Sequence, residues 1–220
     1  YNIPIIQVYG STETAPIAIC QKISIKRTPY GNTGKVAIHN TAKIFDKDHK
    51  EVRNNIVGEI GIKGKNLFSY YWKDPIKTKK AFSNNWFMTG DYGKKNKNDN
   101  FYVVGRKNNI IISGGENIYP SELEEALNKE KYIIESAIIG VYDIKWEEVP
   151  VAFIKVKKQS LSDLSEFKSN LVIKLAKYKI PKKIFYVEDI PKNTLGKIDY
   201  KILKAYYIKL INEVKTKEKK

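Results

Sequence analysis

Short apolar runs alternate with polar turns through the first half of the chain. Glycine, proline and asparagine residues separate five runs that are typical of β-strands, at 5–10, 17–23, 34–40, 59–64 and 101–105. One helix is expected within this half, because Asp74 is a favourable N-cap residue and Pro75 suits the first helical turn. The pattern therefore predicts a β-rich, sheet or barrel-like region over residues 1–105.

The spacing of apolar residues changes after Ile110, where strand-like and helix-like runs follow one another. Ser121 and Glu124 have the spacing of a capping box, which predicts a short helix with an apolar face beneath it. Strands are expected at 135–141, 149–156 and 183–187, and further helices over a stripe of Leu164, Phe167, Leu171 and Leu175 and from about Asp199. This alternation predicts a compact α+β domain over residues 106–214. The ending KTKEKK, 215–220, is too polar to pack and is expected to be disordered.

Composition narrows the function classes. The 220 residues carry a formal net charge of +16, which suits anionic partners such as nucleic acid. Lysines are scattered through nearly every segment rather than gathered in one stripe, however, so a general compositional bias explains the charge better.

Cys20 is the only cysteine, which excludes an intrachain disulfide and favours a reducing, cytoplasmic location. No apolar run approaches the roughly 20 residues that a membrane span needs, although peripheral membrane contact stays open.

Residues 9–14, YGSTET, bring several chemical groups together after a predicted strand. Tyr9 offers an aromatic ring, Gly10 allows close approach of the backbone, Thr12 offers a hydroxyl that suits phosphate, and Glu13 offers a carboxylate that suits Mg²⁺. An ordinary polar turn after a buried strand explains these residues equally well.

Later segments add further candidates, each with a plain structural alternative. Asp91, in NNWFMTGDYG, can accept both hydroxyls of a ribose, or it can simply close an Asx-turn. Gly114 and Gly115 follow Arg106 and can serve a narrow channel, or only the turn of a hairpin that leads into a helix. Lys197 ends the tight polar loop PKNTLGK and can be aimed at a ligand, or it can be a solvated loop lysine.

The segments YGSTE, WFMTGD, GR-x(5)-ISGGENIYPSELE and PKNTLGK occur in this order over residues 9–197. The ordered set resembles the adenylate-forming (AMP-binding) superfamily of acyl-CoA synthetases, luciferases and peptide-synthetase adenylation domains. ISGGENIYPSELE is most similar to acyl-CoA synthetases that act on fatty, aryl or related carboxylic acids. The resemblance covers the whole chain, and implies that 1–105 is the C-terminal part of a large AMP-binding domain and 106–214 a C-terminal cap domain.

The resemblance also implies an ATP site in the first region. Tyr9 would lie against the adenine, Thr12 would contact phosphate, and Glu13 would hold magnesium. Asp91 would bind the ribose hydroxyls, with Arg106 beside it.

For the second region, the resemblance implies a catalytic role for Lys197. This lysine would bridge the acid's carboxylate and the α-phosphate while negative charge develops. The cap would then rotate about residues 106–108, withdraw Lys197, and present Gly114 and Gly115 to the thiol of coenzyme A. The family usually has Asp or Lys at the hinge position; this chain has Asn108, which tolerates left-handed backbone angles and can still act as a pivot.

Other parts of the family pattern do not occur in these residues. The family's phosphate loop, which ends in Pro-Lys-Gly, is missing, and Met88 is the only methionine. We therefore expect further sequence upstream, and expect residues 1–220 to be inactive by themselves.

The resemblance predicts ATP-dependent activation of a fatty or aryl acid to an acyl-adenylate, followed by transfer to CoA, with release of AMP and pyrophosphate. Alternatives are a ligase that loads a carrier protein, an inactive fragment of such an enzyme, and a basic nucleic-acid-binding protein. The sequence favours small-molecule partners over nucleic acid, and it leaves the acid and the oligomeric state open.

Overall fold

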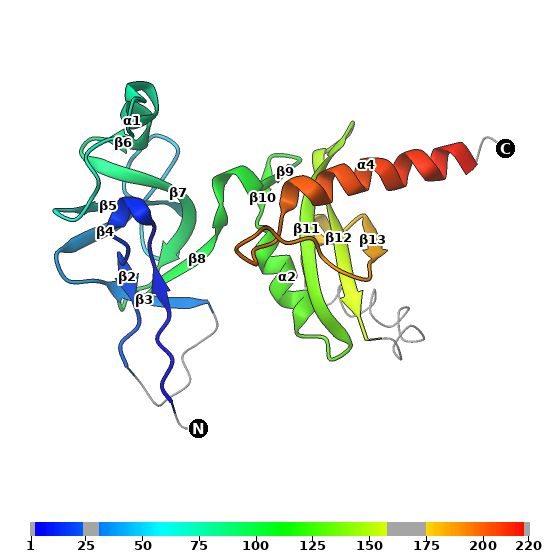
Figure 1. Ribbon diagram of the computed structural model, residues 1–220, viewed down its shortest axis with the longest axis horizontal. Coiled ribbons are helices and arrows are strands. Elements are labelled where there is room, and N and C mark those ends of the chain that lie inside the picture. Colours follow the sequence, from blue (N-terminus) through cyan, green and yellow to red (C-terminus); the bar gives the residue numbers. More distant parts are fainter. Residues whose placement is uncertain (1–2, 24–30, 158–174, 218–220) are drawn as a thin grey trace. The chain divides into compact units, whose positions relative to one another are not determined.

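The computed structural model describes residues 3–23, 31–157 and 175–217 (Figure 1). The chain forms two compact units, Tyr1–Asn108 and Asn109–Lys220. Both units combine strands with helices, which confirms the predicted α+β class. The sequence places the domain boundary between residues 105 and 106, whereas the two units divide after Asn108.

Eight strands form one antiparallel sheet in the described part of the first unit. Their order is β1-β2-β3-β8-β7-β5-β4, and β6 pairs with β7. The bounds are Val8–Tyr9 (β1), Ile19–Cys20 (β2), Asn32–Val36 (β3), Asn40–Phe45 (β4), Gly58–Gly64 (β5), Phe82–Ser83 (β6), Trp86–Lys95 (β7) and Phe101–Arg106 (β8). The runs at 59–64 and 101–105 coincide closely with β5 and β8, whereas 5–10 and 17–23 contain much shorter strands. The pattern does not predict β4 or β7 as strands.

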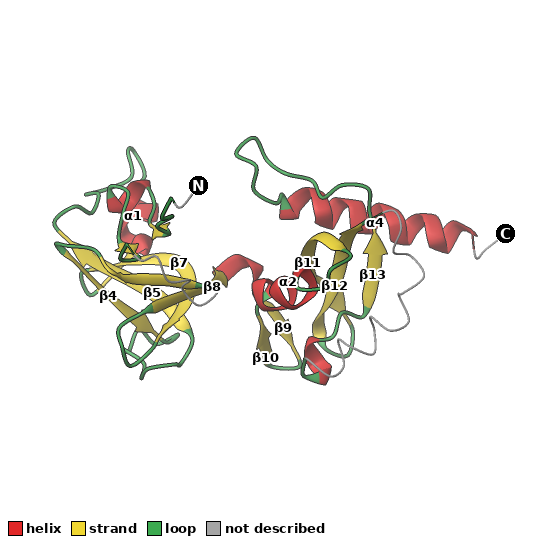
Figure 2. Ribbon diagram, turned by 90° about the horizontal axis from the view of Figure 1, so that it is seen from below, coloured by secondary structure: helices red, strands yellow, loops and turns green. Residues whose placement is uncertain are grey.

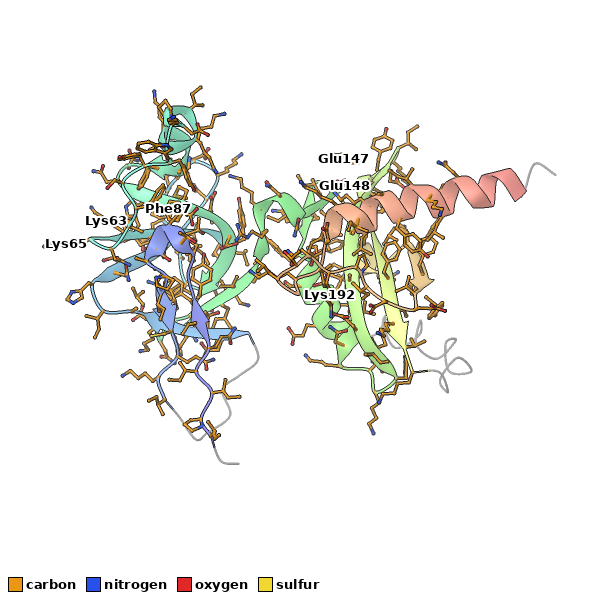
Figure 3. All side chains as sticks on the ribbon, in the orientation of Figure 1. Lys63, Lys65, Phe87, Glu147, Glu148 and Lys192 are labelled. Carbon is orange, nitrogen blue, oxygen red and sulfur yellow. The ribbon has the colours of Figure 1, made fainter. Side chains whose placement is uncertain are left out.

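The central strands β5, β7 and β8 build the core of the first unit. Ile60 and Ile62 are fully buried and lie two residues apart on β5, so both point into the same core. Phe87 of β7 (Figure 3) and Phe101 of β8 complete this centre. Each such side chain contributes about 1.5–3 kcal/mol on burial.

The predicted N-cap of the first-unit helix is confirmed. Helix α1 spans Pro75–Ala81, and the Asp74 carboxylate accepts a hydrogen bond from the Lys77 amide at 2.8 Å. The cap satisfies a backbone donor that the first helical turn otherwise leaves without a partner.

In the second unit, five described strands form a sheet with the order β10-β9-β12-β11, and β13 joins β12 in parallel (Figure 2). The strands are Ile111–Ser113 (β9), Glu116–Ile118 (β10), Ile133–Asp143 (β11), Glu147–Val156 (β12) and Lys183–Tyr186 (β13). The described helices of this unit are Pro120–Asn128 (α2) and Tyr200–Lys217 (α4), with a 3-10 turn at Lys177–Lys179 (η4). A 3-10 turn at Thr12–Thr14 (η1) belongs to the first unit, and another at Lys107–Asn109 (η2) lies at the division between the units.

Helices α2 and α4 cover opposite faces of this sheet. Ile138 of β11 packs in one core with Leu123 of α2, while the next residue, Ile139, packs in another with Leu203 of α4. Successive side chains on a strand point to opposite faces, which explains why one strand serves both cores. Figure 1 shows α4 passing across β11 and β12, with α2 beside β11.

The predicted capping box is wrong. Helix α2 begins at Pro120, so Ser121 lies inside the first turn rather than at the cap. Proline suits this first position, and the helix therefore starts earlier than the Ser-Glu spacing indicates. The Glu124 carboxylate instead accepts hydrogen bonds from the Ile138 amide at 2.9 Å and the Tyr200 hydroxyl at 3.2 Å.

Two other expectations concern the C-terminal region. The helix expected over Leu164, Phe167, Leu171 and Leu175 lies outside the described residues, apart from Leu175. Helix α4 continues to Lys217, past the point at which a disordered tail was expected. No helix in the described ranges is long and apolar enough to cross a membrane.

Candidate functional site

Asp91 lies at the centre of a polar cluster in the first unit. Strands β7 and β8 pair Asp91 directly with Arg106, whose Nε lies 2.7 Å from Asp91 Oδ1. The Tyr9 hydroxyl, which comes from β1, donates to Asp91 Oδ2 at 2.8 Å. The sheet thus joins three candidate residues that are far apart in the sequence.

The carboxylate at the centre is more shielded than its partner. The Asp91 side chain is 13% exposed and that of Arg106 is 63% exposed. Burial and the nearby Asp91 charge raise the pKa of Tyr9 well above its ordinary range, so its hydroxyl stays protonated as a donor. A carboxylate offers about four acceptor positions, so Asp91 can receive further donors beyond Tyr9 and Arg106.

Glu59 of β5 also supports this cluster, and no sequence pattern predicted a role for it. Its carboxylate is buried and accepts from the Gly90 amide and from Lys107 Nζ, both at 3.1 Å. The hydrogen bond from Lys107 to Glu59 raises the pKa of Lys107. The Glu59 carboxylate therefore holds Gly90, next to Asp91, and Lys107, next to Arg106. The available signal was a lone carboxylate within the apolar run of β5.

Thr89 fixes the backbone at Asp91. Its hydroxyl donates to the Ile60 carbonyl at 2.8 Å and accepts from the Asp91 amide at 3.1 Å. The orientation of Asp91 is therefore determined by the turn as well as by its side-chain partners.

The segment after β1 turns tightly at η1. A side chain at Gly10 would collide with the Pro16 carbonyl, which explains the glycine at this position. The buried Thr14 hydroxyl accepts from the Ser11 amide at 2.8 Å and closes the turn, whereas Thr12 is exposed. The threonine expected to contact phosphate is thus accessible, while its neighbour has a structural role.

Glu13 presents an ionised carboxylate beside this turn. Burial by itself raises the pKa of Glu13, but hydrogen bonds from its own backbone, Ser11 and Tyr71 outweigh this effect and lower the pKa below its ordinary value. The Tyr71 hydroxyl donates to Glu13 Oε1 at 3.0 Å. A partly accessible, ionised carboxylate fits a hard divalent cation such as Mg²⁺.

Gly114 and Gly115 form the turn between β9 and β10, directly before α2. Their φ values are +57° and +83°, in the left-handed region that favours glycine. The Gly114 amide donates to the Trp146 carbonyl at 2.9 Å, and a Cβ on Gly114 would lie 2.7 Å from the Trp146 ring. The hairpin geometry alone accounts for both glycines, so a role toward a thiol stays a prediction.

Lys197 lies on an exposed loop that is closed by Asn193. The Asn193 side-chain oxygen accepts from the amides of Leu195 and Lys197, each at 3.0 Å, and the Asn193 amide donates to the Lys197 carbonyl at 2.8 Å. The loop therefore fixes the backbone of Lys197 and leaves its side chain exposed. Lys192 differs, because its Nζ lies 2.9 Å from a Glu135 carboxylate oxygen.

Asn108, the predicted pivot, lies in η2 at the division between the two units. It is not among the residues with positive φ, so this structure does not use its tolerance of left-handed angles.

Comparison with known proteins gives these groups a family context. Residues 1–72 match the family model described as AMP-binding enzyme, and residues 122–197 match that of the AMP-binding enzyme C-terminal domain. The chain belongs to the AMP-binding enzymes. It is 36% identical, over 197 residues, to an indoleacetate–CoA ligase of Aromatoleum aromaticum, a match that covers 90% of this chain and 39% of the relative.

Solved structures of AMP-binding enzymes have the same fold. ATP-bound MatB from Rhodopseudomonas palustris matches with a TM-score of 0.86 and 33% identity, over 92% of this chain and 40% of that one. The o-succinylbenzoate CoA synthetase of Bacillus subtilis, in complex with its acyl-adenylate intermediate, matches with a TM-score of 0.80 and 33% identity, over 89% and 40% respectively. The chain thus spans about two fifths of the length of the relatives it matches.

Proposed function

We propose that the whole protein carrying these residues activates a carboxylic acid with ATP and transfers the acyl group to coenzyme A. In the first step a carboxylate oxygen attacks the α-phosphorus of ATP, which forms the acyl-adenylate and releases pyrophosphate. In the second step the thiol of CoA attacks the acyl carbon, AMP leaves, and the thiol proton passes to the surroundings. The domain assignment belongs to the same proposal, with 1–105 as part of the large AMP-binding domain and 106–214 as its cap.

The cluster of Tyr9, Asp91 and Arg106 is the observation that carries this proposal. A shielded carboxylate of fixed orientation is suited to accept the two hydroxyls of a ribose, and charge-assisted bonds of this kind contribute about 1.5–3 kcal/mol each. Tyr9 contributes its ring to the adenine and its hydroxyl to Asp91. Arg106 places its positive charge next to the carboxylate and fixes one of its oxygens.

The remaining groups have roles at the phosphates and the acyl centre. Thr12 binds phosphate through its exposed hydroxyl. Glu13 would hold the Mg²⁺ that accompanies ATP, and this cation would neutralise negative charge on the phosphates. Lys197 stabilises the developing negative charge in the adenylation step. Gly114 and Gly115 leave room for the pantetheine chain of CoA.

The relatives support an aryl acid as the substrate class. Indoleacetate and o-succinylbenzoate, the acids named for two of the matched proteins, both contain an aromatic ring. Exchange of labelled pyrophosphate into ATP by the whole protein, stimulated by an aryl acid, is the expected result. Absence of exchange with both aryl and fatty acids would contradict the proposal.

A second function differs only in the acceptor. A ligase that loads a carrier protein would show the same pyrophosphate exchange but no thioester with free CoA. We expect acyl-CoA to form on addition of CoA, and acylation of a carrier protein alone would favour the second function.

A further inference from the structure

Glu13 is held twice by one neighbouring segment, residues 66–78. The Phe68 amide donates to the Glu13 carbonyl at 3.0 Å, and the Tyr71 hydroxyl donates to Glu13 Oε1 at 3.0 Å. The same segment reaches the next residue, because the Asn66 side chain donates to the Thr14 carbonyl at 2.6 Å. Backbone and side chain of Glu13 are therefore positioned from a part of the chain more than fifty residues away.

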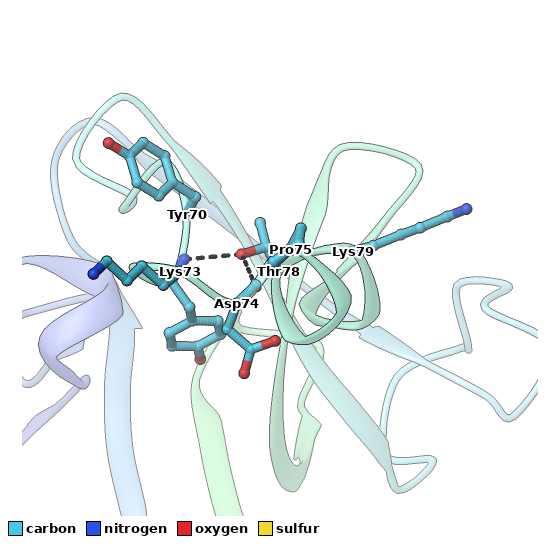
Figure 4. Close-up of a pocket in the computed structure, with 7 residues that line it drawn as sticks. Tyr70, Lys73, Asp74, Pro75, Thr78 and Lys79 are labelled. Atoms are coloured by element: carbon cyan, nitrogen blue, oxygen red, sulfur yellow. Dashed lines mark hydrogen bonds between the residues drawn. The ribbon is translucent and has the colours of Figure 1, made fainter.

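Tyr71 is itself held at several points. Its amide donates to the Thr78 hydroxyl at 2.9 Å, and that hydroxyl donates to the Asp74 carbonyl at 2.8 Å (Figure 4). Its ring packs against Phe68 with a centroid distance of 4.7 Å, and Lys77 Nζ lies 4.1 Å from its centroid. The start of α1 thus fixes the base and one face of the tyrosine.

Packing does not enclose Tyr71 completely. A cavity of about 360 Å³ borders it, lined by Tyr70, Tyr71, Lys73, Asp74, Pro75, Thr78 and Lys79 (Figure 4). Because Tyr71 borders open space, the bond from its hydroxyl to Glu13 contributes to fixing both groups.

We propose that Tyr71 is a positioning residue for the Glu13 carboxylate, and that it sets the affinity of the site for a divalent cation bound with ATP. The proposal rests on the metal role of Glu13 in the proposed function. Tyr71 does not touch the cation or the reacting atoms; it restricts the rotamers of Glu13 before the cation arrives.

Substitution of Tyr71 by phenylalanine tests the proposal, because it removes the hydroxyl and keeps the ring. Electron paramagnetic resonance measures the affinity of the whole protein for Mn²⁺ in the presence of a non-hydrolysable ATP analogue. We expect this affinity to fall about tenfold in Tyr71→Phe. Binding of the analogue without metal, and the melting temperature, should stay near their original values. The apparent Mg²⁺ requirement of pyrophosphate exchange should rise similarly, while the rate at saturating Mg²⁺ is retained.

Tyr70→Phe is the matched control, since Tyr70 is adjacent, 60% exposed, and loses the same atom. It should leave Mn²⁺ binding unchanged. Equal loss from Tyr70→Phe, or unchanged Mn²⁺ binding in Tyr71→Phe, would overturn the inference. A lower melting temperature with weaker metal-free binding of the analogue would also overturn it, by assigning Tyr71 a general structural role.

Glu13→Gln separates this inference from the proposed function. If Glu13→Gln weakens Mn²⁺ binding and Tyr71→Phe does not, only the role of Tyr71 is rejected. If Glu13→Gln leaves Mn²⁺ binding unchanged, the metal role of Glu13 is rejected and the inference is rejected with it.

Discussion

Asp91 and Arg106 face each other on β7 and β8, with Arg106 Nε 2.7 Å from Asp91 Oδ1. Because the two residues are a cross-strand pair, the sheet itself sets their separation. The Tyr9 hydroxyl occupies the other carboxylate oxygen at 2.8 Å. Both oxygens thus have fixed partners before any ligand binds, which preorganises the carboxylate for further donors.

Asp91→Asn tests whether this carboxylate binds ribose. The substitution keeps the size of the side chain but replaces charge-assisted bonds by neutral ones, so ATP binding to the whole protein should weaken by about 1.5–3 kcal/mol. Isothermal titration with ATP measures this loss. Asp99→Asn, on the loop between the same two strands, is the control and should bind ATP normally. Unchanged affinity in Asp91→Asn would favour the turn-closing role of Asp91.

The contrast between Asp91 and Glu59 illustrates what the sequence could predict. Asp91 and Arg106 lie in ordered motifs, so the resemblance indicated that the two are neighbours. Glu59 lies outside those motifs, and its contacts with Gly90 and Lys107 depend on how β5 and β7 pair. Such pairing joins distant segments, and the local pattern of polar and apolar residues does not specify it.

Local sequence patterns predicted structure correctly where both partners of a contact lie within a few residues of each other. Asp74 caps α1 as expected, because its partner lies three residues away. The Ser121–Glu124 spacing failed because Glu124 has distant partners, Ile138 and Tyr200, which hold its carboxylate in the interior. Tertiary contacts therefore replaced a local cap.

Glu124 should make the stability of the second unit depend on pH. Burial raises the pKa of Glu124, although the bonds from Ile138 and Tyr200 lower it in part. A carboxyl with a raised folded-state pKa stabilises the fold while protonated, and this stabilisation is lost as pH rises through the folded-state pKa. Glu124→Gln keeps a carbonyl acceptor without the charge, so it should gain stability relative to the original protein as pH rises.

Urea unfolding at about pH 4 and about pH 7 measures this difference. We expect the advantage of Glu124→Gln to be larger at the higher pH. An advantage of equal size at both values would mean that the charge of Glu124 does not affect stability.

Glu147 is expected to be a site of backbone strain. It follows the turn between β11 and β12 and has φ of +66°, where a residue with a Cβ is disfavoured (Figure 3). Glu147→Gly should relieve this strain and raise the free energy of unfolding by about 0.5–1 kcal/mol, after the larger chain entropy of unfolded glycine is subtracted. Glu147→Ala removes the carboxylate but keeps the Cβ, and should bring no gain. Equal stabilisation by both variants would point to the charge of Glu147 rather than to its backbone.

Lys197→Ala should separate the two half-reactions of the whole protein. The Asn193 side chain and backbone hold the loop in place, so truncation of the exposed Lys197 side chain should leave the loop intact. Loss of a preorganised charge at the adenylation transition state costs about 2.7–4 kcal/mol, or about 10²–10³ in rate, by analogy with oxyanion-site donors. The thioester step should keep its rate when pre-formed acyl-adenylate and CoA are supplied, because the charge acts only in adenylation.

The structure also determines the control for this experiment. Lys192 (Figure 3) carries the same charge on the same loop, but its ion pair with Glu135 means that Lys192→Ala also breaks a contact with β11. Lys201, in the first turn of α4, is exposed, and Asp199 caps its backbone amide rather than its side chain. Lys201→Ala therefore removes one positive charge near Lys197 and should leave both half-reactions intact. Equal damage to both half-reactions by Lys197→Ala would assign Lys197 a folding role, and a similar loss from Lys201→Ala would indicate that net charge, rather than position, determines the rate.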